Sequence, residues 1–127
     1  MDLPRRPRVL VSERPAEALS ESSEGGRPLP EAEVLVDEDE FRAAGEAQRK
    51  KLRDLAVRLR QEPFLGNRIR RSQIPGAFRS LPNLFRLELP DGWRALYTVA
   101  SRAPFGSQLR IIWIGDHKRY ERLFGYD

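Results

Sequence analysis

The chain lacks cysteine entirely and has one histidine and one methionine among its 127 residues. Without cysteine it forms neither disulfide bonds nor a thiolate metal site, which fits a reducing compartment. No apolar run approaches the ~20 residues that a membrane-spanning helix needs, and the first residues contain no signal-peptide apolar region. These absences predict a soluble, cytoplasmic protein with no membrane partner.

Charged residues make up 33% of the chain and apolar residues 39%, which at this length predicts one domain, residues 1–127, with a compact core. The charge is uneven. Residues 1–48 hold 6 basic and 12 acidic side chains, whereas residues 49–127 hold 17 basic and 7 acidic. The basic part suggests a polyanionic partner. A solvated, arginine-rich surface explains the same composition.

Residues 1–62 predict one strand and two helical regions, which are separated by an insertion. Residues 8–12 indicate a strand and residues 13–20 a short helix. Residues 21–36 are typical of a flexible or variable insertion, although the apolar triplet at 34–36 is also compatible with a strand. From Asp37 to residue 62 the periodicity is helical, with Gly45 as a possible division. The acidic run at 37–40 indicates a helix cap, and we expect no metal site there.

The last third predicts three strands at about residues 84–89, 93–100 and 109–115, followed by a short helical turn over 118–124. The turns are expected at residues 90–92 and 104–107. A three-residue first turn pairs Glu88 with Arg94 and places Arg86 on the same face as both. A two-residue turn would mix charged and apolar side chains on one face, so the three-residue turn is preferred.

Metal-free cleavage of a phosphodiester needs groups that move protons and cations that hold the phosphate. Imidazole, phenol, carboxylate and guanidinium groups all fall at or near the ends of these strands. The candidates are Arg86, Glu88, Arg94, His117 and Tyr120. Four of the five also have an ordinary structural explanation: Glu88 and Arg94 can form a cross-strand pair, His117 can be a surface or packing residue, and the ring of Tyr120 can close a core.

Three motifs resemble one known family. They are the segment 83–89 (Asn-Leu-Phe-Arg-Leu-Glu-Leu), the segment 92–97 (Gly-Trp-Arg-Ala-Leu-Tyr) and the closing segment 116–126 (Asp-His-Lys-Arg-Tyr-Glu-Arg-Leu-Phe-Gly-Tyr). Together with Arg-Arg-Ser-Gln-Ile-Pro at 70–75, they resemble a RelE-like branch of the RelE/ParE superfamily of type II toxins. The similarity covers about residues 46–127 well and 7–20 loosely.

The resemblance implies an α+β fold: a small antiparallel sheet, made of an N-terminal strand and a three-strand C-terminal meander, with two helices packed on one face. The other face would be concave and basic. RelE-like members cleave mRNA in the ribosomal A site without a metal or other cofactor, and a cognate antitoxin fills the cavity. ParE-like members inhibit DNA gyrase and lack the nuclease residues.

Carried onto this chain, the resemblance implies that Arg94 and Arg86 contact the scissile phosphate and that His117 acts as general acid or base. Tyr120 would orient or protonate the substrate, as in some nuclease members, or stack on a base, as in others. Glu88 departs from the lysine that some members carry, and serves either as a base or, as we prefer, as the partner of Arg94. Basic residues in the loop and after the last strand are candidates for holding an RNA backbone, although a solvated loop explains the loop arginines equally well. The candidates are Arg68, Arg70, Arg71, Arg79, Lys118 and Arg119.

Overall fold

The computed structural model of the protein describes residues 7–11, 32–101 and 106–125. The elements, in chain order, are β1 (Pro7–Val11), β2 (Ala32–Asp37), α2 (Glu38–Ala43), α3 (Glu46–Leu59), β3 (Asn67–Arg68), β4 (Phe85–Glu88), β5 (Arg94–Ser101), β6 (Ser107–Gly115) and α4 (His117–Phe124). Short 3₁₀ turns occur at η1 (Arg71–Gln73), η2 (Gly76–Phe78) and η3 (Pro90–Gly92). Within these ranges no helix has the length and apolar character needed to cross a bilayer.

The strands form one six-stranded sheet in the order β1-β2-β6-β5-β4-β3. β2 runs parallel to β6, and the other neighbouring strands are antiparallel. The sheet is therefore mixed, which corrects the expectation of a purely antiparallel one. The physical reason is the long connection between β2 and β6: a parallel pair needs a crossover rather than a hairpin, and α2 and α3 lie within that crossover.

The strand β2 corrects a second expectation. The sequence indicated a flexible or variable insertion over residues 21–36, but residues 32–36 belong to β2, where Val34 and Val36 are fully buried. Residues 21–31 and the helix predicted at 13–20 lie outside the described residues. The strand predicted at 8–12 is present as β1, and it pairs with β2 at the edge of the sheet.

The helical region divides as its sequence indicates. The Asp37 carboxylate accepts hydrogen bonds from the backbone N–H groups of Asp39 and Glu40, at 2.9 and 3.2 Å, and so caps α2. Gly45 is the N-cap residue of α3, so the division falls where it was predicted. The side chain of Glu40 does not complete a capping box. It accepts instead from the backbone N–H of Ile114 at 2.9 Å, which ties α2 to the end of β6.

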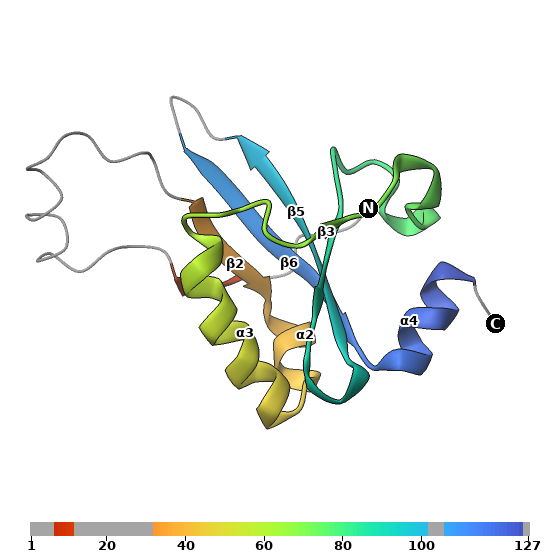
Figure 1. The fold of residues 1–127 in the computed structure, drawn as a ribbon, viewed down its shortest axis with the longest axis horizontal. Helices are drawn as coiled ribbons and strands as arrows, with labels where there is room; N and C mark the ends of the chain where they lie inside the picture. Colours follow the sequence, from red (N-terminus) through yellow and green to blue (C-terminus); the bar gives the residue numbers. More distant parts are fainter. Residues whose placement is uncertain (1–6, 12–31, 102–105, 126–127) are drawn as a thin grey trace, which may run out of the picture.

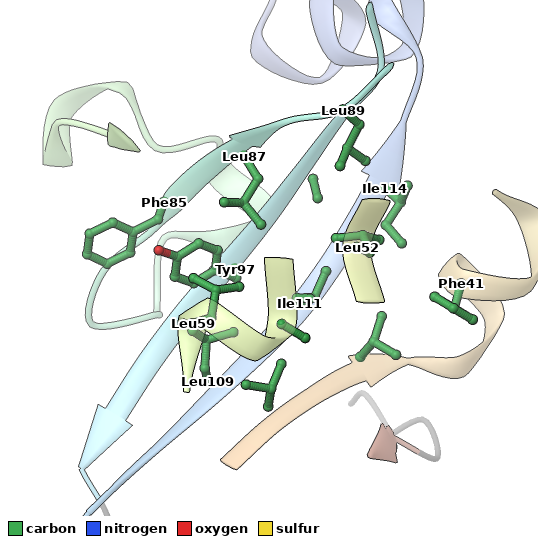
Figure 2. Close-up of a cluster of buried hydrophobic side chains, with 14 of the residues drawn as sticks. Phe41, Leu52, Leu59, Phe85, Leu87, Leu89, Tyr97, Leu109, Ile111 and Ile114 are labelled. Atoms are coloured by element: carbon green, nitrogen blue, oxygen red, sulfur yellow. The ribbon is translucent and has the colours of Figure 1, made fainter. Parts of the chain in front are cut away.

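Both helices pack on one face of the sheet (Figure 1). On α3 the buried apolar residues Leu52, Ala56 and Leu59 recur at helical spacing. They meet alternate side chains of the strands in a core that is drawn in Figure 2. The strand residues of this first core are Val34, Val36, Phe85, Leu87, Ala95, Tyr97, Val99, Leu109, Ile111 and Ile114, and Leu89 joins them just after β4.

The opposite face carries a smaller second core, which consists of Ile74, Leu84, Leu96, Trp113 and Tyr120. It is covered by α4 and by the segment 69–83, both of which lie across the sheet from α3 (Figure 1). The candidate site lies on this side of the sheet.

The segment 63–83 is held at both ends, so it is a shaped element rather than a structureless loop. At its start the Tyr97 hydroxyl donates to the Pro63 carbonyl at 2.9 Å and accepts from the Gly66 N–H at 2.8 Å. Burial raises the pKa of Tyr97, which keeps the phenol neutral and able to donate. At its end the Asn83 side chain bonds both backbone groups of Val99.

Candidate active site

The hairpin between β4 and β5 has the predicted register. Glu88 pairs with Arg94, and the Leu89 N–H donates to the Trp93 carbonyl at 2.9 Å across the turn. Asp91 and Gly92 have φ values of 59° and 76°, which the tight turn requires. As a result Arg86, Glu88 and Arg94 all lie on the face opposite α3.

Glu88 holds the two arginines of this face together. Its Oε1 lies 3.2 Å from Arg94 Nε, and its Oε2 lies 2.8 Å from Arg86 Nε. The contact with Arg94 is a hydrogen bond. The contact with Arg86 is an ion pair only, because the Arg86 Nε–H is not aligned for a hydrogen bond to the carboxylate. The predicted partner role of Glu88 is thus present in the structure, extended to a second arginine.

The start of α4 brings the imidazole to the same place. Asp116 caps the helix by accepting from the backbone N–H of Arg119 at 2.9 Å, and Gly115, at the end of β6, pairs with Arg94. His117, the first residue of the helix, then lies with its Nδ1 3.4 Å from Arg94 Nη1. Its side chain is 58% exposed, so it faces solvent beside the guanidinium.

Tyr120 lies one turn further along α4 and is only 5% exposed. Its ring packs against Trp113 and Phe124, with centroids 6.0 and 4.5 Å away, and the Arg94 guanidinium carbon lies 4.8 Å above it. Its hydroxyl accepts from Arg86 Nη1 at 3.4 Å, a hydrogen bond that raises the pKa of Arg86 against the opposing effect of burial. Tyr120 therefore contacts both arginines, Arg86 through its hydroxyl and Arg94 through its ring.

Glu121 belongs to the site although the sequence did not single it out. Its Oε2 lies 2.9 Å from His117 Nε2, on the side of the ring away from Arg94. The available signal was the i, i+4 spacing of a histidine and a glutamate in a segment already expected to be helical. That spacing is common on solvated helix faces, so by itself it did not indicate a role.

Among the arginines of the basic loop, two make hydrogen bonds that shape the loop and one is exposed without such a role. Arg71 donates to the carbonyls of Leu81 and Arg79, each at 2.8 Å, and Arg79 donates to the carbonyl of Ile74 at 3.2 Å. These bonds hold the segment in its turn conformation, so two of the predicted RNA-binding side chains are used in shaping the loop. Arg70 is exposed beside them.

The remaining predicted RNA contacts do not converge on the site either. Arg68 pairs with Phe85 across the strands, and its guanidinium carbon lies 5.5 Å from that ring, on the face that carries the first core. Arg119 donates to the carbonyl of Ile114 and lies over the Trp113 ring at 5.0 Å. Lys118 is exposed at the start of α4.

Two shallow hollows flank the second core, with volumes of about 290 and 430 Å³. The first is lined by the segment 68–71 with Ile74, Pro82 and Asn83, and the second lies between the segment 72–79 and the last turn of α4. The five candidate catalytic residues line neither hollow. Glu88 and His117 are open to solvent, Arg86 and Arg94 are partly buried beside them, and the ring of Tyr120 lies buried beneath this cluster.

Comparison with known proteins adds no relative. No family model matches the chain, and neither a curated protein nor a solved structure matches it significantly.

Proposed function

We propose that the protein is a RelE/ParE-type toxin of a type II toxin–antitoxin system, an endoribonuclease that cleaves mRNA, on the ribosome, and thereby inhibits translation. The observation that supports it most directly is the contact between Arg94 and His117. A planar cation and an imidazole lie 3.4 Å apart on an open face, where a phosphodiester could reach both. Its partners would be mRNA, the ribosome and a cognate antitoxin protein.

In the proposed reaction the ribose 2′ oxygen bonds to phosphorus and gives up its proton, while the bond from phosphorus to the 5′ oxygen breaks. The products are a 2′,3′-cyclic phosphate and a 5′ hydroxyl, so no oxidant, reductant or metal is required for the balance. Arg94 and Arg86 stabilise the charge that develops on the phosphoryl oxygens. His117 moves a proton, and Tyr120 orients the two arginines.

Mapping of RNA ends after induction tests this proposal. Primer extension on translated mRNA should reveal new 5′ ends that carry a hydroxyl, and His117→Ala should reduce their rate of appearance by about 10²–10⁴-fold, the usual contribution of a general acid or base. Arg58→Ala, on an exposed α3 side chain across the sheet, is the control and should cleave normally. Growth arrest without new ends, or ends that persist in His117→Ala, would contradict the proposal.

Glu88 supports a second candidate, a non-catalytic protein of the same fold that only binds. Because its carboxylate contacts both Arg86 and Arg94, part of the positive charge offered to a phosphate is already neutralised. One version is a ParE-like gyrase inhibitor, and the other is a degenerate toxin that binds RNA or an antitoxin. Inhibition of gyrase supercoiling by the purified protein would identify the first version, and an unaffected supercoiling rate would exclude it.

Glu88→Gln separates these possibilities within one molecule. The substitution keeps the shape of the side chain but removes its charge, so we expect RNA affinity to rise about 3- to 10-fold at low salt, with a salt dependence steeper by about one phosphate contact. Filter binding across a salt series measures both. Glu62→Gln, on an exposed glutamate that pairs with Arg58, is the matched control.

Cleavage by the same variant distinguishes the two roles of Glu88. If it is a counterion, cleavage by Glu88→Gln is maintained or faster. If it is the general base, cleavage falls by 10²-fold or more while binding improves. Tighter binding with no cleavage by either protein would favour the non-catalytic candidate.

A further inference from the structure

The two nitrogens of the His117 ring face partners of opposite hydrogen-bonding character. Nδ1 lies 3.4 Å from Arg94 Nη1, and a guanidinium can only donate. Nε2 lies 2.9 Å from Glu121 Oε2, and an ionised carboxylate can only accept. In the neutral ring both contacts are satisfied by a single arrangement, in which the proton is on Nε2 and the lone pair is on Nδ1.

From this geometry we infer that Glu121 is a positioning residue that, together with Arg94, holds His117 as the Nε2–H tautomer and makes it a general base through Nδ1. The catalytic part of this inference depends on the proposed function. It also decides between the acid and base roles that the sequence left open, because the resting ring directs an unprotonated nitrogen toward the phosphate-binding guanidinium.

The groups around the His117 ring carry charges of both signs. The Arg94 guanidinium, from β5, and the N-terminal end of α4 both place positive charge beside the imidazole, because His117 is the first residue of that helix. The turn η3 is close as well, since a Cβ added at Gly92 would lie 3.8 Å from the Cβ of His117. Glu121 places a negative charge 2.9 Å from Nε2, where it holds the Nε2 proton.

The proton balance of the step follows directly. A phosphate that engages Arg94 draws the guanidinium from Nδ1 and leaves that lone pair facing the ribose. Nδ1 takes the 2′ proton as the oxygen bonds to phosphorus, and Glu121 stabilises the resulting imidazolium through Nε2–H. The departing 5′ oxygen takes its proton from water, because the site is open and Tyr120 is buried.

The chain has a single histidine, so nuclear magnetic resonance of the ¹⁵N-labelled full chain reads this ring without interference. We expect the neutral ring to show a protonated Nε2 and an unprotonated Nδ1. In Glu121→Gln the partner of Nε2 is no longer an acceptor only, because an amide also donates, so the preference of the neutral ring for the Nε2–H form should weaken. Glu62→Gln should leave this preference unchanged. A neutral ring protonated on Nδ1, or an unaltered tautomer ratio in Glu121→Gln, overturns the inference.

Cleavage gives an independent second readout. In Glu121→Gln the single-turnover rate should fall together with the fraction of the Nε2–H form, and Glu121→Asp, which keeps a carboxylate, should recover both. A lower rate with an unaltered tautomer ratio would indicate a merely structural role, which contradicts the inference. If neither protein cleaves while the resonance results hold, the proposed function fails and the tautomer assignment stands.

Discussion

Replacing Arg94 by alanine should reduce RNA cleavage by about 10²–10³-fold, the effect of removing one charge-stabilising donor group from a phosphoryl or oxyanion site. Arg94 is the residue through which the cluster is connected. It contacts Glu88 through Nε and His117 through Nη1, and it lies over the Tyr120 ring. Single-turnover cleavage of RNA at saturating protein measures the loss without the confounding effect of weaker binding.

Arg94→Lys is the informative second variant. An ammonium retains the charge but not the planar fork that reaches a carboxylate, an imidazole and a phosphate together, so we expect it to recover only a small part of the lost rate. Arg58→Ala serves as the control for loss of an exposed arginine. If Arg94→Lys cleaves as fast as the wild type, charge alone is sufficient and the geometry of the fork has no catalytic role.

Tyr120→Ala should destabilise the fold by about 3–5 kcal/mol, as large-to-small substitutions of buried aromatic residues do. The ring belongs to the second core and packs between Trp113 and Phe124, so its removal leaves a cavity under α4. Urea unfolding measures the loss. Because α4 carries His117, the same variant should also lose cleavage.

Tyr120→Phe isolates the hydroxyl from the ring. It keeps the packing and the cation–π contact with Arg94, and removes only the hydrogen bond from Arg86. We expect stability within about 1 kcal/mol of wild type, the net value of one hydrogen bond, and cleavage reduced less than about tenfold. A loss of 10²-fold or more in Tyr120→Phe would show that the phenol moves a proton in the reaction, contrary to the orienting role proposed here.

The C-terminal hairpin could be predicted in detail because two local rules agreed. Apolar and charged residues alternate over 85–88, and only a three-residue turn at Pro90-Asp91-Gly92 places Arg94 on the charged face with Arg86 and Glu88. For β2 the sequence left two possibilities open, a strand at residues 34–36 or part of a variable insertion. β2 lies between β1 and β6, and its short apolar run, Val34-Leu35-Val36, has no alternation of apolar and polar residues that would identify a strand.

The site could be predicted as a set of residues but not as a network. The residues on β4 and β5 follow from the register, whereas the approach of His117 to Arg94 depends on how α4 leaves β6, which no local pattern specifies. The same limit explains the loop arginines. Arg71 and Arg79 indicate an RNA contact by composition, but the carbonyls they bond to become available only in the folded turn.

The parallel pairing of β2 with β6 also affects the order in which the strands associate during folding. Residues such as Glu33 and Gln108, 75 apart in the chain, become neighbours through this pair, and contacts at such separations are slow to form. The antiparallel hairpin of β5 and β6, which pairs Arg94 with Gly115, needs no such closure. The strands that carry the cluster can therefore associate before β2 docks against the other edge of β6.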